Sequence, residues 1–294
     1  MFSQYFGNYL LNKGLVHPDH LREALDFQSS THLKLGVLAI NSGYMNSGQV
    51  DEIHEKQKQV DKRFGELAVD MNYMTRMQVD ELLSTQKTGH LLLGQALIDQ
   101  GYLTMLQLQN ALDEYKKDYS LDNKQFKALQ HDDISIIIDT FVKLKESPHS
   151  TVYKDYLVLF VKNVIRFLDE SPIVGECLPL EELDPGWYVW QELFGDLNLT
   201  TAISGNEKVF LEIGGKYAGE HLTEMNELAK SSVAEFLNLH NGIFVVNMSN
   251  GGMDVDLRPQ TLHDGPNAPT GIGKVLVIPF DITGGRFNLV IAPA

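Results

Sequence analysis

The stretch "LGVLAINSGYMNSGQVDEIHEKQ" (residues 35–57) decides how the first third of the chain folds, because it recurs. It aligns without a gap with segments that start at Phe6, Phe64 and Leu93, so the four copies start 29 residues apart. A fixed period between about 20 and 50 residues is typical of stacked supersecondary units. Residues 1–118 are therefore predicted to form a helical domain of four repeats.

Each repeat is predicted to be a short helix, a turn and a second helix. The first helix ends at a residue that tolerates a left-handed conformation, namely Gly14, Gly43, Asn72 or Gly101. The second helix begins with a capping box, Thr75 with Gln78 and Thr104 with Gln107, or with a proline in the first helical position, Pro18. These signals predict helix boundaries in every repeat.

The repeats resemble the MshEN motif, the N-terminal repeat of type II secretion and pilus ATPases, in their spacing of leucine, glycine and a closing glutamine. In that family, tandem motifs bind cyclic di-GMP, which a leading arginine and the glycine backbone approach. The resemblance implies a cyclic di-GMP site at Lys34, Gly36, Arg63 and Gly65.

This chain departs from the MshEN motif at several positions. Only Arg63 keeps the leading arginine, and Tyr115 replaces the closing glutamine in the fourth repeat. The other three repeats keep that glutamine, as Gln28, Gln57 and Gln86. The alternative interpretation is a helical array that binds proteins, in which the apolar stripes form the core and the glycines cap helices.

The 29-residue register is lost after residue 118, where a polar and charged stretch marks a domain boundary. Residues 119–150 are predicted to be a linker and a helix. Two helical patterns occur here, "DDISIIIDTFVKLKE" (132–146) and "STVYKDYLVLFVKNVIRFLDE" (150–170). Both are apolar on all sides, so we expect them to be buried.

From residue 187 the apolar pattern changes toward period two, which is typical of strands. Six segments are predicted to be strands: "LNLTTAIS" (197–204), "KVFLEIGG" (208–215), "GIFVVNMS" (242–249), "MDVDLRP" (253–259), "KVLVIPFDI" (274–282) and "FNLVIA" (287–292). One helix is predicted over residues 223–241. The expected fold class is therefore α+β, a helical repeat domain followed by an α/β sandwich with a mostly antiparallel sheet.

The predicted helix 223–241 has two different sides. Ser231, Glu235 and Asn238 follow the spacing i, i+4, i+7, which places them together on one side. The opposite side carries an apolar anchor, Val233, Phe236, Leu237 and His240. The three polar side chains are therefore predicted to face solvent or a partner, although a glutamate and an asparagine on a wet face usually do no more than keep a helix soluble.

The pattern Ser231-x-x-x-Glu235-x-x-Asn238, followed by Gly242 and later by Pro259, is similar to the signature of the CheX, CheC and FliY phosphatases of bacterial chemotaxis. The order of the flanking segments over residues 151–294 resembles that of CheX. The presence of only one copy of the signature also favours CheX over CheC, which has two copies. The resemblance implies a CheX-like domain that hydrolyses the aspartyl phosphate of a response regulator.

The same resemblance implies roles for individual residues. Asn238 would orient the attacking water, since a carboxamide offers both a donor and an acceptor. Glu235 would dock the helix by pairing with the active-site lysine of the regulator, while Ser231, Gly242 and Pro259 would support the motif. It implies no cofactor bound by this chain, a Mg²⁺ ion on the regulator, and a homodimer. The competing hypothesis is a non-catalytic adaptor or cyclic di-GMP sensor that uses the repeats.

Composition narrows the classes of partner. The net charge of -15 argues against a nucleic acid or an anionic membrane surface as the main partner. There is no run of about 18 apolar residues, so no membrane insertion is expected, and a single cysteine, Cys177, favours a reducing compartment such as the cytoplasm. The histidines are not spaced as metal ligands, so no metal site is expected.

Overall fold

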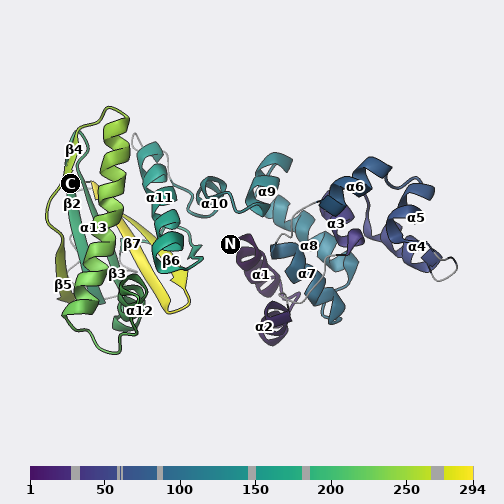
Figure 1. The fold of residues 1–294 in the computed structure, drawn as a ribbon, viewed down its shortest axis with the longest axis horizontal. Helices are drawn as coiled ribbons and strands as arrows, with labels where there is room; N and C mark the ends of the chain where they lie inside the picture. Colours follow the sequence, from purple (N-terminus) through teal and green to yellow (C-terminus); the bar gives the residue numbers. More distant parts are fainter. Residues whose placement is uncertain are drawn as a thin grey trace. The chain divides into compact units, whose positions relative to one another are not determined.

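The computed structural model describes residues 1–27, 34–57, 60, 62–84, 89–144, 150–180, 186–265 and 275–293. It divides into two compact units, Met1–Asp133 and Ile134–Ala294 (Figure 1). Two of the closing glutamines, Gln28 and Gln86, lie outside the described residues. Among the described residues, no helix combines the length and the apolar content needed to cross a bilayer.

The first unit contains two helices for each repeat and one further helix. Their bounds are α1 Phe2–Asn12, α2 Pro18–Phe27, α3 Leu35–Asn41, α4 Ser47–Gln57, α5 Phe64–Asp70, α6 Arg76–Ser84, α7 Gly89–Asp99, α8 Met105–Asp118 and α9 Asn123–Gln130. The residue that ends each first helix has the expected positive φ: 66° at Gly14, 69° at Gly43, 56° at Asn72 and 75° at Gly101. Both predicted capping boxes are present as well. The prediction of helix, turn and helix is confirmed.

One glycine in each first helix, near the start of α3 and α5 and in the middle of α1 and α7, lets the second helix of the same repeat pack closely. A Cβ atom on Gly36 would lie 2.9 Å from Val50 Cγ1, and one on Gly65 would lie 2.9 Å from Val79 Cγ1. Gly7 faces Leu21 and Gly94 faces Leu108 in the same way. The facing side chain is buried in all four repeats. These glycines therefore serve the packing of the repeat itself rather than capping its helices.

The repeats do not stack in sequence order. The second repeat packs on the third through α3, α4, α5 and α6, and the first packs on the fourth through α1, α2, α7 and α8. Helices α7 and α8 also contact α3, and α8 contacts α4, so the spatial order is first, fourth, second, third (Figure 1). A simple array, in which each repeat contacts its sequence neighbours, is not what the chain forms.

Equivalent tyrosines and glutamates connect the paired repeats. The phenol of Tyr44 donates to Glu81 at 2.8 Å, and the phenol of Tyr73 donates to Glu52. The phenol of Tyr102 donates to Glu23 in the other pair. Each hydrogen bond joins the turn of one repeat to the second helix of its partner repeat. The same tyrosine–glutamate contact therefore occurs in both pairs of repeats.

Tyr115, which stands where the motif has glutamine, is part of the core. It is fully buried, and its ring contacts Phe2, Tyr9 and Phe126 at centroid distances of 5.3, 4.9 and 6.3 Å. These rings belong to α1, α8 and α9, so Tyr115 joins the first repeat, the fourth repeat and the helix that follows. The departure from the motif is explained by aromatic packing.

The described residues of the second unit form four helices and seven strands. Their bounds are α10 Ile134–Phe141, α11 Ser150–Leu168, β1 Ile173–Val174, β2 Gly186–Gly195, β3 Leu199–Gly205, α12 Glu207–Ala218, α13 Glu227–Asn250, β4 Val255–Leu257, β5 Thr261–Gly265, β6 Leu276–Ile282 and β7 Gly285–Pro293. The strand order is β1-β6-β7-β3-β2-β4, with β5 also paired to β2, and every pairing is antiparallel. The predicted α+β class with an antiparallel sheet is confirmed.

Two segments predicted to be strands are helical. Residues 208–215 lie in α12, where the Asn206 side chain caps the helix by accepting from the Val209 backbone N–H at 3.0 Å. Residues 242–249 lie in α13, which does not end at Gly242 but continues to Asn250. In this part of α13, Phe244 is buried and Val246 is exposed. Residues two apart lie on the same face of a strand but on different faces of a helix, so this pattern is helical. Tertiary packing outweighs the strand preference of Val, Ile and Phe here.

Helices α11, α12 and α13 pack on one another over the sheet (Figure 1). The Phe160 ring of α11 contacts the rings of Phe236, Phe280 and Phe287, which come from α13, β6 and β7. Trp190 alternates to the other face of β2, where it packs on a small apolar cluster of Ala202, Val277 and Val290. Helices α11, α12 and α13 thus cover one face of the sheet. Their contacts with one another and with the sheet hold α13, the helix that carries the signature, in place.

Candidate functional site

Helix α13 is held by one completely buried side. Val233, Phe236, Leu237 and His240 are all 0 % exposed, as their helical spacing predicts. His240 lies edge-on to Tyr156 and Phe160, at centroid distances of 4.4 and 5.0 Å. A helix anchored in this way has little freedom to rotate or shift, so the positions from which side chains leave its other side are fixed.

The signature residues lie on that other side. Ser231 and Glu235 are exposed, and Asn238 is half-buried. The Asn238 Nδ2 atom donates to both carboxylate oxygens of Glu235 at 3.4 Å. The Ser231 hydroxyl donates to the Leu228 carbonyl at 3.2 Å, so it is engaged within the helix. Glu235 and Asn238 are therefore the two side chains of the signature that offer polar atoms outward.

The same stripe continues along α13 beyond the signature. Gly242 lies one turn after Asn238, and a Cβ atom placed on it would meet no heavy atom of the described residues within 4 Å. Val246 is 58 % exposed one further turn along, and Leu228 is 41 % exposed at the other end. A glycine inside a helix costs about 1 kcal/mol relative to alanine. No contact in the described part of the fold requires a glycine at position 242, unlike Gly36 and Gly65 in the first unit.

A pocket of about 500 Å³ opens beside Glu235. It is lined by residues of α12, α13 and the segment around β5: Tyr217, Ser231, Ser232, Ala234, Glu235, Gln260 and Leu262. Burial, followed by the negative charge of Glu235, raises the pKa of Tyr217 above its usual value. The phenol therefore stays protonated and can donate a hydrogen bond at the wall of this pocket.

Below Asn238 the structure places a buried network of amides that sequence reasoning missed. Gln191 on β2 is 1 % exposed and donates to Asn238 Oδ1 at 2.8 Å. Asn241, one turn of α13 deeper, donates to Gln191 Oε1 at 2.9 Å. A signal was available, because Gln191 stands between the buried Val189 and Leu193 on the inward side of a strand. A polar residue in such a position needs a hydrogen-bonding partner.

Pro259 lies next to this network and not on α13. It is exposed, and it follows Arg258, whose carbonyl accepts from Gln191 Nε2 at 2.8 Å. Between the pairings Leu193 with Leu257 and Trp190 with Thr261, β2 has two residues (191 and 192) and the opposite segment has three (258–260). The edge therefore bulges at Pro259, directly opposite Gln191.

His240 is near the site but is not available as a proton donor or acceptor to a substrate. Burial lowers its pKa to about 3, so the ring is neutral at ordinary pH. Its Nδ1 atom lies 3.0 Å from Asn163 Nδ2, and its Nε2 atom is buried. Its contribution is to anchor α13. Among the described residues, no three His, Cys, Asp or Glu side chains form a group that could hold a metal ion.

The four residues of the predicted cyclic di-GMP site lie around the paired helices α3 and α5. Lys34 and Arg63 directly precede these helices, and the Lys34 Nζ atom pairs with Asp99 Oδ1 at 2.5 Å. The space beside Gly36 and Gly65 is filled by Val50 and Val79. Both basic residues hold equivalent positions in the two repeats, but one of them is already paired with a carboxylate.

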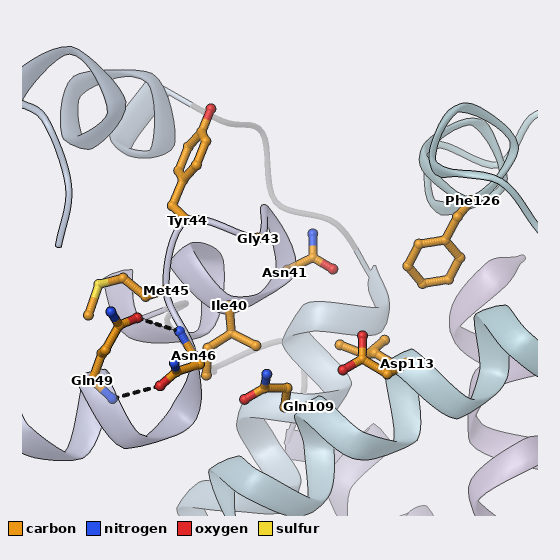
Figure 2. Close-up of a pocket in the computed structure, with 11 residues that line it drawn as sticks. Ile40, Asn41, Gly43, Tyr44, Met45, Asn46, Gln49, Gln109, Asp113 and Phe126 are labelled. Carbon is orange, nitrogen blue, oxygen red and sulfur yellow. Dashed lines mark hydrogen bonds between the residues drawn. The ribbon is translucent and has the colours of Figure 1, made fainter.

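A separate pocket of about 320 Å³ lies in the first unit, between the turn after α3, α8 and α9 (Figure 2). Figure 2 shows Asn46 and Gln49 joined by two reciprocal hydrogen bonds of 2.9 Å, which cap α4. The Gln109 Oε1 atom accepts from the Ser47 backbone N–H at 2.8 Å. These amide oxygens accept hydrogen bonds from backbone N–H groups. None of the residues predicted to bind cyclic di-GMP lines the pocket.

Known proteins were compared with the chain at the level of sequence and of structure. No family model matches the sequence, and no curated protein sequence matches it. Among solved structures, a chemotaxis protein CheX from Desulfovibrio desulfuricans is 15 % identical and has a TM-score of 0.44, covering 49 % of this chain and 99 % of that one.

Two further solved structures have similar values. CheX from Vibrio vulnificus is 18 % identical with a TM-score of 0.42, covering 47 % of this chain and 95 % of its own. The complex of CheX with CheY, BeF3 and Mg²⁺ from Borrelia burgdorferi is 19 % identical with a TM-score of 0.41, covering 48 % of this chain and 96 % of that one. The structural neighbours are thus chemotaxis proteins that match about half of this chain.

Proposed function

We propose that the second unit is a phosphatase that removes the aspartyl phosphate of a response regulator, with α13 as the helix that enters the site of the regulator. The observation that carries the proposal is the outward-facing pair of Glu235 and Asn238, 3.4 Å apart, on a helix whose opposite side is fully buried. Rigid presentation of two polar side chains is what a helix inserted into a partner's site requires.

The proposed chemistry needs little from this chain. Transfer of a phosphoryl group to water depends mainly on a water molecule held in line and on charge compensation at the phosphoryl oxygens. In our proposal the Mg²⁺ ion and lysine of the regulator supply the charge, and Asn238 positions the water. Glu235 pairs with the lysine of the regulator and so fixes the helix in its site.

Gly242 supports the same proposal. Because a Cβ atom at this position would meet none of the described residues within 4 Å, the absence of a side chain would benefit a partner that approaches α13 from outside. The partner would then lie closest to the helix backbone one turn beyond Asn238. The exposed Val246 and Leu228 would supply apolar contact at the two ends of the stripe.

The test is the decay of phosphorylated regulators in the presence of this protein. Replacing Asn238 by alanine should slow assisted decay about 100-fold, as the loss of one positioned hydrogen-bond donor does in other enzymes. The matched control is Asn247→Ala, because Asn247 is exposed on the same helix about half a turn around from Asn238. Decay that is unchanged by wild-type protein, across the regulators of the organism, would refute the proposal and favour a non-catalytic adaptor.

A second proposal concerns the first unit. We propose that its paired second and third repeats bind cyclic di-GMP. It is supported by the equivalent positions of Lys34 and Arg63 before α3 and α5, whose first turns lie close together, since a Cβ atom built on Gly65 would lie 3.1 Å from Leu35 Cδ2. A phosphate would replace Asp99 as the partner of Lys34. Calorimetry with cyclic di-GMP tests this proposal. Arg63→Ala should reduce the heat of binding, and Arg76→Ala, at an exposed arginine outside the proposed site, is its control. No heat at high micromolar ligand would leave the array as a protein-binding unit.

We also propose that the second unit pairs with a second copy through a sheet edge. Within the described part of the chain, β1 ends the sheet on one side and β4 and β5 end it on the other, so each has backbone groups on its outer side. Light scattering during gel filtration measures the mass directly, and a monomer across micromolar concentrations would contradict the pairing.

A further inference from the structure

We infer that Gln191 is a positioning residue that fixes the direction of the Asn238 carboxamide, so that Asn238 faces a partner with its N–H₂ group. The arrangement begins at the Arg258 carbonyl and passes through Gln191 to Asn238. The orientation follows from the hydrogen bonds alone. Its catalytic consequence rests on the function proposed above.

The first step is fixed by a backbone carbonyl. The Arg258 oxygen lies 2.8 Å from the Gln191 side-chain amide, and a carbonyl oxygen can only accept. The atom of Gln191 that faces it must therefore be Nε2, which carries the hydrogens. The direction of a glutamine amide is otherwise ambiguous, because its oxygen and nitrogen have the same shape, but here the backbone decides it.

The second step holds the other end of the same amide. Gln191 Oε1 accepts from Asn241 Nδ2 at 2.9 Å, and that nitrogen also donates to Thr201 Oγ1 at 3.0 Å. Asn241 Oδ1 accepts from the Tyr156 phenol at 2.7 Å. Gln191, Asn241, Thr201 and Tyr156 are all buried. Reversing Gln191 would place its N–H₂ group against that of Asn241 and leave buried donors without acceptors.

The third step reaches the surface. The second hydrogen of Gln191 Nε2 is donated to Asn238 Oδ1 at 2.8 Å. The oxygen of Asn238 is thus turned inward, and its Nδ2 atom points toward Glu235 on the outer side. Asn238 therefore meets a partner as a hydrogen-bond donor. The acceptor at the site is the Glu235 carboxylate, so donor and acceptor are divided between two residues instead of being combined in one amide.

Pro259 completes the arrangement from the exposed side. A residue that precedes proline is restricted to extended backbone, which limits the directions of the Arg258 carbonyl. Arg258 is also held by its backbone N–H, 2.9 Å from the Glu192 carbonyl, and by its guanidinium Nε, 2.9 Å from the Glu192 carboxylate. A proline 21 residues after Asn238 in sequence would in this way help to set the Asn238 amide.

The experiment compares Gln191→Met with wild-type protein, because methionine has a similar length and no amide. We expect the maximal rate of regulator dephosphorylation to fall about tenfold to 100-fold, while the KM for the regulator changes less than about twofold. Gln191 is 1 % exposed and cannot contact the regulator, so binding should be spared. Thr200→Val is the matched control, since Thr200 is buried on the adjacent strand and lies outside the network.

A second readout does not depend on activity. In a nitrogen-15 NMR spectrum, the side-chain N–H₂ signals of Asn238, assigned by their loss in Asn238→Asp, should move in Gln191→Met and stay in place in Thr200→Val. Unmoved signals in folded Gln191→Met protein would overturn the inferred orientation. Moved signals with an unchanged maximal rate would overturn the positioning role.

The two readouts separate this inference from the proposed function. If wild-type protein fails to accelerate decay of any regulator, the proposed function fails, and the NMR comparison still decides the orientation of Asn238. If Gln191→Met does not fold, Pro259→Ala takes its place, because Pro259 is exposed and its truncation leaves no buried cavity. We expect the same movement of the Asn238 signals there, with a smaller change in rate, and unmoved signals would again count against the inference.

Discussion

Gly36 and Gly242 both lie inside helices, but the space beside them differs. A Cβ atom on Gly36 would lie 2.9 Å from Val50 of the same repeat, whereas one on Gly242 would meet no atom within 4 Å in the part of the chain that the structure describes. The first glycine is explained by the folding of its own unit. The second is not explained by any contact within 4 Å among the described residues. Helix α13 likewise has one side that packs within the chain and one side that is open. Three predictions test this difference between packed and open positions.

The largest effect is expected on the buried side of α13 and depends on pH. Burial lowers the folded pKa of His240 to about 3, whereas an unfolded histidine has a pKa of about 6.5. Between these values the unfolded state binds a proton that the folded state does not, so stability falls as the pH falls. The loss attributable to His240 should approach about 1.4 kcal/mol per pH unit well below pH 6.5, and it should total about 2.3 kcal/mol from pH 6.5 to 4.5.

Denaturant unfolding of the second unit at a series of pH values measures this slope. His240→Gln, which keeps a polar partner for Asn163, should remove most of the difference in slope from wild type. The exposed His221→Gln should retain the wild-type slope. Equal slopes in all three proteins would show that His240 is not buried as a neutral anchor.

The next effect concerns the packed glycines of the first unit. Gly36→Ala should destabilise that unit by about 2 kcal/mol, because the new methyl group overlaps Val50 and overpacking outweighs the gain in helix propensity. A double variant that adds Val50→Ala frees the space, so it measures the coupling between the two positions. Independent, additive losses would contradict the close contact of Gly36 with Val50.

The smallest effect on stability, and of opposite sign, is expected at the open glycine. Gly242→Ala should stabilise the second unit by up to about 1 kcal/mol, because alanine favours helix and no described residue would clash with the new methyl group. The same change should weaken the interaction with a phosphorylated regulator about tenfold through a clash worth about 1–3 kcal/mol at the interface. A stabilised variant with unchanged dephosphorylation would show that no partner approaches this turn.

Features of the chain that depend on neighbouring residues were predictable from sequence. The left-handed turns at Gly43 and Asn72 and the cap at Thr104 are fixed by local backbone needs, and the structure has all of them. The exposure of Glu235 followed from helical spacing. The second half of α13 was mispredicted because residues such as Val245 and Val246 prefer strands, and only packing across the whole helix reverses that preference.

Features that join distant segments could not be read in the same way. Gln191 and Asn238 are 47 residues apart, and no periodicity relates a strand residue to a helix residue that far along the chain. The spatial order of the repeats was missed for a related reason. Four nearly equivalent repeats do not specify by their motif which pairs will meet, and that choice depends on residues such as Tyr115 that break the motif.

The pairing of the first repeat with the fourth has a consequence for the order of folding during synthesis. Tyr9 reaches its hydrogen-bonding partner Asp118 across 109 residues, and Glu23 meets Tyr102 across 79. A ribosome would release the first repeat long before the surface that covers it exists. The second and third repeats can associate while translation continues, whereas the first must wait with apolar helices uncovered. Chaperone demand in this protein should therefore be concentrated on its first 27 residues.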